Sequence, residues 1–372
     1  MPFTLHGKYT DAAIFTDNID NETISQIMYM INRLDYLKDS HIAIMPDCHA
    51  GKGCVIGTTM TVTDKIVPRF VSADIGCGVL ALKLKQEHID LKELDAAIRR
   101  YIPHGYSLHD HDVTPLYNTR LDEIKAPISF NRVPRSLGTL GGGNHYIEID
   151  KDETGFLWLV IHTGSRHLGT EIGKYYNQLA ANRHIHREHI NYHPDFAYLT
   201  GYDFEDYIED AIIAQAFARQ NRFMIAYKIM DAMKLDAYDY IDTVHNYVDT
   251  SPFGYYIIRK GAVAAPLNQE LIIPLNMRDG ALICTGKGNP EWNQSAPHGA
   301  GRVLSRSDAK DVITLEEYQK AMEGIYSTSI CRSTIDESPM AYKPADEIIK
   351  NIEPTVTIKS RLRPVYNFKS SK

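Results

Sequence analysis

Glycine-rich segments that carry aspartate, cysteine and histidine recur along this chain at the ends of predicted strands. Loops held by a rigid scaffold are where reactive side chains are most often placed. Each segment alone has an ordinary interpretation: a tight turn, a buried structural cysteine, or a satisfied histidine. Together they form a candidate active site. They are MPDCHAGKGC (45–54), SADIGCGV (72–79), LGTLGGGNHYIEI (137–149), IHTGSRHLG (161–169), TVHNYVD (243–249) and SAPHGAGRVLSRSDAK (295–310).

Metal binding is the first chemistry that these segments indicate. One thiolate, one carboxylate and three imidazoles suit one or two borderline divalent cations, and a thiolate can bridge two ions as a carboxylate does. Affinity alone would favour Zn²⁺, and the residue types do not select Mn²⁺. The candidate ligands are Asp74, Cys77, His145, His162 and His245.

Phosphoryl chemistry is the second. His298 stands in a glycine loop before Arg302 and Arg306, which could grip phosphates through paired N–H groups. A neutral imidazole attacks phosphorus without first losing a proton, so His298 is a candidate nucleophile. The glycines 141–143 could let the backbone approach a phosphate, and Arg166 follows His162 in a loop typical of an anion site.

Apolar periodicity predicts the elements that position these groups. Alternation and apolar runs predict strands, and a three-four spacing predicts a helix over 22–34 with Asn21 as its N-cap. A second helix begins at about 91, with Asp90 and Glu93 as a capping box. If 144–148 is a strand, Asn144 and Glu148 share a face that excludes His145, unless the strand starts after His145. The predicted strands are 41–45 (ending at Pro46), 54–62, 79–85, 156–161, 255–261, 270–275 and 281–286.

The chain shows no clean domain boundary. Between about 171 and 235 its character changes to helices, and strands return afterwards. No repeat or Gly/Ser linker interrupts it. We therefore expect one α+β domain over residues 1–372, with a helical insertion at about 171–235.

Bulk properties narrow the class of protein. A net charge of −7 excludes a uniformly basic nucleic-acid binder, so any nucleic acid must be bound by a local patch. Five scattered cysteines fit neither a disulfide framework nor a zinc ribbon. The start lacks a signal-peptide pattern, and no apolar run approaches the roughly 18 residues of a membrane span. A cytoplasmic protein is the expectation.

Nine motifs resemble those of the RtcB family of RNA ligases and occur in the family's order. The resemblance runs from about residue 40 to 369 and implies an α+β RtcB-like domain, with mixed and antiparallel sheets around a central metal cleft. The motifs are MPDCHAGKG, SADIGCG, GGGNHYIEI, IHTGSRHLG, VHNY, RKGA, SAPHGAGRxxSR, SPMAYKP and YNFK.

The resemblance assigns roles to particular residues. His298 corresponds to the guanylated histidine, and Asp47 would orient its ring. Two Mn²⁺ ions would be held by Asp74, Cys77, His145, His162 and His245, with Cys77 bridging. The nucleotide GTP would be contacted by Asn144, Glu148, Asn246, Pro274, Asn276, Met277, Arg302, Tyr342 and Lys369, with Tyr342 stacking on guanine and Lys369 at its edge. Phosphates of GTP or RNA would meet Arg166, Lys260 and Arg306.

The implied activity joins an RNA 3′-phosphate or 2′,3′-cyclic phosphate to a 5′-hydroxyl through a histidine–GMP adduct. The loop PLNMRDGAL (274–282) departs from the PG-S-M-G pattern of larger members, His49 and His167 stand where many members have other residues, and the chain is shorter than most. These departures suggest a compact bacterial-type branch devoted to RNA repair rather than tRNA splicing. A monomer is expected, with an archease-type activator as a candidate partner.

Two other functions compete with the ligase. The same ligands could serve a metal-dependent phosphodiesterase or cyclic phosphatase that acts on RNA ends without GTP. A non-catalytic RNA-binding relative is the third hypothesis. Basic residues such as Arg132, Arg135, Arg361 and Arg363 would carry RNA contact in each case, and binding would then weaken steeply with salt.

Overall fold

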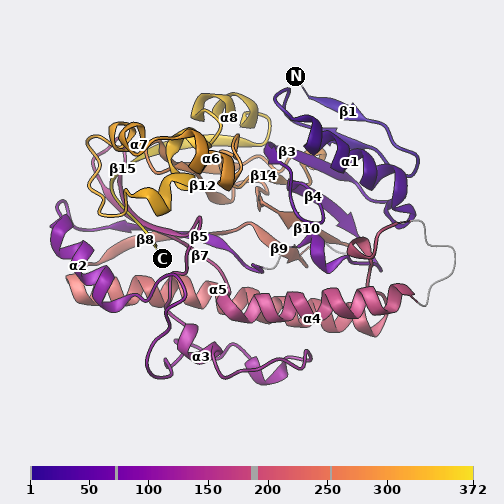
Figure 1. Ribbon diagram of the computed structural model, residues 1–372, viewed down its shortest axis with the longest axis horizontal. Coiled ribbons are helices and arrows are strands. Elements are labelled where there is room, and N and C mark those ends of the chain that lie inside the picture. Colours follow the sequence, from indigo (N-terminus) through magenta and orange to yellow (C-terminus); the bar gives the residue numbers. More distant parts are fainter. Residues whose placement is uncertain (1, 72–73, 186–191, 252–253, 372) are drawn as a thin grey trace.

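Two large β-sheets, two long helices on one side of them and several shorter helices elsewhere make up most of the protein in a computed structural model, which describes residues 2–71, 74–185, 192–251 and 254–371 (Figure 1). The α+β fold class predicted from the sequence is confirmed. The helices are α1 (Asn21–Arg33), α2 (Leu91–Tyr101), α3 (Val133–Ser136), α4 (Arg166–Ile185), α5 (Tyr202–Met233), α6 (Arg306–Val312), α7 (Leu315–Ala321) and α8 (Ala345–Ile352).

The larger sheet has seven antiparallel strands in the order β12-β13-β15-β6-β7-β5-β8. Leu80, Leu82 and Leu84 project from one face into a core shared with α2 and α5, while Val79 and Ala81 face a second core on the other side. This alternation follows from the strand period of two. The strands are β12 (Glu270–Asn276), β13 (Gly280–Gly286), β15 (Val356–Lys369), β6 (Tyr146–Lys151), β7 (Leu157–Thr163), β5 (Gly78–Leu84) and β8 (Ala237–Val244).

The second sheet has six strands, ordered β1-β2-β3-β4-β10-β9, and only the β2–β3 pair is parallel. A short two-stranded sheet pairs β11 (Ala262–Ala264) with β14 (Ser295–Pro297). The six strands are β1 (Phe3–Leu5), β2 (Ala12–Ile14), β3 (Ile42–His49), β4 (Ile56–Val62), β10 (Tyr256–Lys260) and β9 (Asn246–Asp249).

Two local predictions in this region are wrong. Strand β3 does not end at Pro46 but continues to His49, because the ladder with β4 breaks register between Ile44 and His49 and needs no N–H from proline there. Helix α1 is capped by Asp20 rather than Asn21, since the Asp20 carboxylate accepts the Thr23 amide at 2.8 Å.

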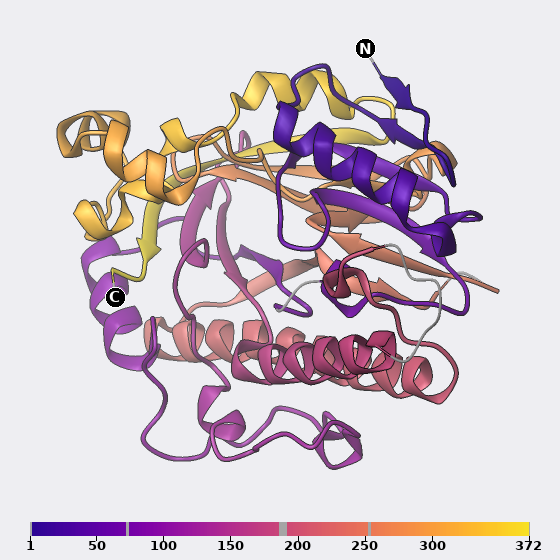
Figure 2. The same ribbon diagram turned by 45° about the vertical axis from the view of Figure 1, so that its right-hand side comes forward.

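The long helices α4 and α5 run side by side beneath the sheets, as both views show (Figures 1 and 2). Their apolar positions, such as Ile172 and Phe217, join the core under the six-stranded sheet. They fall close to the helical region predicted at about 171–235. The assignment of residues 1–372 to one domain stays a prediction. In the described parts of the chain, no helix is long and apolar enough to cross a membrane.

The register of the seven-stranded sheet brings several motifs to one edge. Gly78, at the start of β5, pairs with Thr163 at the end of β7 and with Val244 at the end of β8. Tyr146, the first residue of β6, pairs with His162. The residues that flank these strand ends must therefore lie close together, although they are far apart in the sequence.

Candidate metal centre and nucleotide cavity

The five predicted metal ligands meet at this edge of the sheet. Cys77 immediately precedes β5, His145 immediately precedes β6, and His245 lies between β8 and β9. The His245 amide donates to the Cys77 carbonyl at 2.9 Å, which ties the two loops together. Strand β6 thus begins after His145, so the apparent conflict between His145 and its neighbours Asn144 and Glu148 does not arise.

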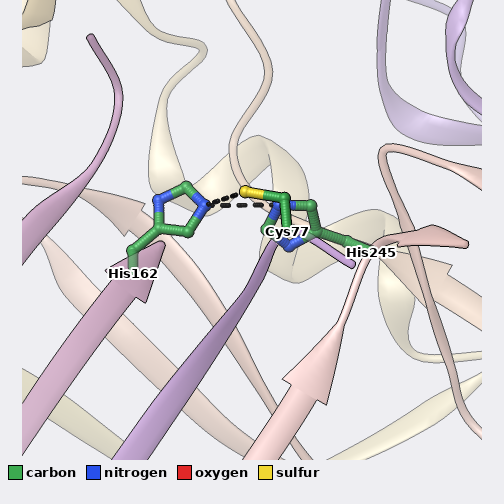
Figure 3. Close-up of side chains that lie close together, drawn as sticks. All are labelled: Cys77, His162 and His245. Atoms are coloured by element: carbon green, nitrogen blue, oxygen red, sulfur yellow. Dashed lines mark hydrogen bonds between the residues drawn. The ribbon is translucent and has the colours of Figure 1, made fainter. Parts of the chain in front are cut away.

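The ligand atoms form two groups that share one sulfur. Cys77, His162 and His245 make one group, and Cys77 with Asp74 and His145 makes the other; within each group all candidate ligand atoms lie within 4.8 Å of one another. In the first group, His162 Nε2 is 3.2 Å from both Cys77 Sγ and His245 Nε2 (Figure 3). In the second, His145 Nε2 lies 3.1 Å from Asp74 Oδ2 and 3.5 Å from Cys77 Sγ.

Hydrogen bonds on the far side of the rings fix which nitrogen can serve as ligand. His145 Nδ1 lies 2.9 Å from the Leu140 carbonyl, and His162 Nδ1 lies 3.1 Å from the Asn144 carbonyl. A carbonyl only accepts, so both Nδ1 atoms carry a proton. His162 therefore presents an Nε2 lone pair to the centre, and His145 directs its Nε2 at the Asp74 carboxylate. Imidazole nitrogens, a thiol and a carboxylate that converge in this way are donor groups that a bound cation would hold together.

Burial shapes the ionisation of this group. It lowers the pKa of His162 and of His245 well below the usual value, and it raises the pKa of the Cys77 thiol, with the neighbouring Asp74 adding to that rise. Burial also raises the pKa of Asp74, but the hydrogen bond from His145 and the charges of His145 and Arg166 outweigh it and bring that pKa to about 2. The donor set of three imidazoles, a carboxylate and a thiol that needs a nearby cation to ionise fits divalent metal binding.

His298 stands beside this group, its ring centroid 4.9 Å from that of His245. Its Nδ1 lies 2.7 Å from Oδ2 of the fully buried Asp47, although the two are not aligned as a hydrogen bond. The same carboxylate oxygen accepts the backbone N–H groups of His298 and Gly299, each at 3.2 Å. These two amides hold the carboxylate next to the ring. Asp47 therefore anchors the loop, and the opposite nitrogen, Nε2, is the candidate reacting atom.

A cavity of about 800 Å³ opens in front of His298, a volume within the usual range of small-molecule sites. Its wall is formed by the histidines and by residues of β6, of the loop between β12 and β13, of the segment before α6 and of the C-terminal strand β15. The predicted residues on its wall are Asn144, Glu148, His162, His245, Pro274, Asn276, Met277, His298, Arg302, Arg306, Tyr342 and Lys369.

Three predicted nucleotide or phosphate residues have other contacts. The Asn246 side-chain carbonyl accepts the Gly261 amide at 2.9 Å. The buried Lys260 ammonium donates to the carbonyls of Lys52 and Arg69. Arg166 lies on the metal side, 3.4 Å from His145 Nδ1, and packs against Gly141. None of the three lines the cavity.

The basic residues proposed for RNA occupy separate places. Arg132 and Arg363 are exposed, one before α3 and the other on β15. Arg135 donates to the His109 carbonyl at 2.7 Å, and Arg361 has a buried Nε without a hydrogen-bond partner among the described residues. Arg132 and Arg363 are therefore the two with side chains open to solvent.

Sequence reasoning missed Glu337, a cavity residue of which 3% of the side chain is exposed. Burial raises the pKa of Glu337, but Lys369, Arg306 and Arg302 more than offset it and lower the pKa to about 2. The only signal was an acidic pair, Asp336 and Glu337, directly before the motif SPMAYKP. Asn367 was also missed; it donates to Glu148, a carboxyl whose pKa burial raises to about 7.

Comparison with known proteins identifies the family of the chain. A family model described as tRNA-splicing ligase RtcB matches residues 30–128 and 119–370. The RNA-splicing ligase RtcB of Escherichia coli K12 is 35% identical over 367 residues, covering 87% of this chain and 89% of the relative. RNA-splicing ligase RtcB2 of another E. coli strain is 29% identical, covering 88% and 87%, and the tRNA-splicing ligase RtcB of Aeropyrum pernix is 28% identical, covering 87% and 86%. The chain belongs to the RtcB family of RNA ligases.

Proposed function

We propose that this protein joins RNA 3′-phosphate or 2′,3′-cyclic phosphate ends to 5′-hydroxyl ends, using GTP and a guanylated His298. The observation that carries the proposal is the position of His298, between two ligand groups that share Cys77 and a cavity of nucleotide size. A hydrolase with the same ligands would use water as its nucleophile and would need no histidine there.

The reaction would begin at His298 Nε2, since Nδ1 faces Asp47. Nε2 forms a bond to the α-phosphorus of GTP as the bond to the β-phosphate oxygen breaks, and pyrophosphate leaves. An oxygen of the RNA 3′-phosphate then attacks the same phosphorus and frees His298. Finally the 5′-hydroxyl oxygen attacks the RNA 3′-phosphorus, its proton passes to solvent, and GMP departs. A 2′,3′-cyclic phosphate must first be opened by water.

Two Mn²⁺ ions would be held by Asp74, Cys77, His145, His162 and His245, with Cys77 shared. When bound, such ions supply charge neutralisation for the attacking and leaving oxygens. The chain's part is to hold three imidazoles, one carboxylate and one thiol in two groups around the Cys77 sulfur, and Arg166 would add positive charge near phosphates on that side.

The base would occupy the part of the cavity lined by Tyr342, Lys369 and Glu148, with Pro274, Asn276 and Met277 on the adjoining wall. Arg302 and Arg306 line the same cavity and would meet the triphosphate. Lys260 could contact a phosphate only by exchanging its two carbonyl partners, and Asn246 would act through the Gly261 backbone.

We further propose that the protein acts in RNA repair or tRNA splicing, in the cytoplasm, as a monomer, with an archease-type protein as a candidate activator. The departures of loop 274–282 from the pattern of larger family members favour RNA repair.

The test is incubation of purified protein with α-³²P-GTP and Mn²⁺, followed by a denaturing gel and acid treatment. We expect an acid-labile label on the wild type and none on His298→Ala. His6→Ala, which changes a surface histidine with 78% of its side chain exposed, is the matched control and should label like the wild type. A fully metallated wild type that takes no label, yet opens a 2′,3′-cyclic phosphate, would instead establish the GTP-independent phosphodiesterase.

A further inference from the structure

A buried carboxylate at the end of the cavity gathers the side chains proposed to contact the nucleotide. Glu337 Oε2 accepts the Tyr342 hydroxyl at 2.8 Å and the Lys369 ammonium at 3.0 Å. Its other oxygen, Oε1, lies 2.5 Å from Arg306 and 3.6 Å from Arg302. These groups come from three separate segments of the chain, so Glu337 is the point at which the segments are held together.

The partners of Glu337 are also arranged against one another. The Arg302 guanidinium lies over the Tyr342 ring, 5.2 Å from its centroid, and the Lys369 ammonium also donates to the Asn144 carbonyl at 3.3 Å. The side chains of Lys369 and Glu337 are 5% and 3% exposed. With so little of either side chain exposed, the charged hydrogen bond between them resists rearrangement.

Glu337 differs in this respect from Glu148, the other carboxylate on the cavity wall. Both oxygens of Glu337 already receive donors from the protein, whereas the donor to Glu148 is Asn367, on one oxygen. A carboxylate whose two oxygens already accept hydrogen bonds from the protein has little capacity to accept another from a base. Its effect must pass through the side chains that it fixes.

We infer that Glu337 is a positioning residue for nucleobase selectivity, because it holds the Tyr342 ring and the Lys369 ammonium in one fixed arrangement at the base end of the cavity. This inference rests on the proposed function, in which those two side chains contact guanine. Glu337 would act through these side chains and not by contact with a reacting atom. Its role would be to fix the positions of the Tyr342 ring and the Lys369 ammonium, which determine whether GTP or ATP binds better.

The test compares labelling of His298 by GTP and by ATP in wild type, Glu337→Gln and Asp336→Asn. Loss of a charged hydrogen bond typically corresponds to about a 10- to 100-fold change in binding. We expect Glu337→Gln to raise the half-saturating GTP concentration by about that factor and to narrow the preference for GTP over ATP. Asp336→Asn is the matched control, since Asp336 pairs with Arg306 and Lys310 but not with Tyr342 or Lys369, and it should keep the preference.

A double variant separates positioning from general damage to the fold. If Glu337 acts through Lys369, Glu337→Gln combined with Lys369→Met should be no more than about twofold worse than the poorer single variant, because the same interaction is lost only once. Losses that multiply, or a Glu337→Gln protein with wild-type selectivity and half-saturation, would overturn the inference. An unlabelled wild type would instead refute the proposed ligase chemistry, so the two failures are distinguishable.

Discussion

Asp47→Asn is the substitution that most directly tests the chemistry assigned to His298. The Asp47 carboxylate is fully buried, and its Oδ2 lies 2.7 Å from His298 Nδ1 and accepts two backbone amides of the same loop. Asparagine keeps the size of the side chain and an acceptor for those amides but removes the negative charge. As Nε2 attacks phosphorus, positive charge develops on the imidazole, and that charge would lose its counter-ion.

The size of the effect follows from the distance. At 2.7 Å and an effective dielectric constant of about 20, two unit charges interact with about 6 kcal/mol. If about half of the positive charge has developed in the transition state, the loss is about 3 kcal/mol, or roughly 10²-fold in rate. The fold should be little affected, because the two amide contacts can be kept.

The assay is the single-turnover rate of His298 labelling by α-³²P-GTP, measured with manganese content and thermal unfolding for each variant. Asp11→Asn is a matched control, since it weakens another Asp–His contact, 2.9 Å long, that lies exposed at the surface. A metallated, folded Asp47→Asn protein that labels within threefold of the wild type would refute the role of this charge.

Three further outcomes are expected. Cys77→Ala should remove the ligand that both groups share. Bound manganese, measured by mass spectrometry, should then fall below one ion per chain, and labelling of His298 should be lost. Retention of two ions would show that Cys77 is not shared. Burial raises the pKa of Glu148 to about 7, so the carboxyl is mostly protonated below that pH and becomes a charged carboxylate, with both oxygens able to accept, above it. GTP affinity should therefore improve from pH 6 to 8 in wild type but not in Glu148→Gln. If Arg132 and Arg363 contact RNA, the logarithm of RNA affinity should fall linearly with the logarithm of salt concentration. Replacing either arginine by glutamine should reduce the slope of that line by about one. An unchanged slope would mean that RNA binds elsewhere on the protein.

Local sequence patterns determined most of the secondary structure because they report local physics. The alternation of Leu80, Leu82 and Leu84 placed β5 within one residue of its observed bounds, and Asp90 does cap α2. The prediction failed at Pro46, where a break in register tolerates a proline inside β3. Whether a proline ends a strand depends on the partner strand, which the local sequence does not contain.

The candidate site divides in the same way. Residue types and motif order were enough to propose the metal ligands, His298 and most of the cavity wall. The pairing of ligands into two groups was decided by the register of β5, β7 and β8, which brings Cys77 within 3.2 Å of His162 from 85 residues away. The tertiary structure alone identified Glu337 as the partner of Lys369 and gave Lys260 two carbonyls as partners. The partners of a buried charge are set by which distant segments pack around it, and a linear sequence records the charge but not the neighbours that compensate it.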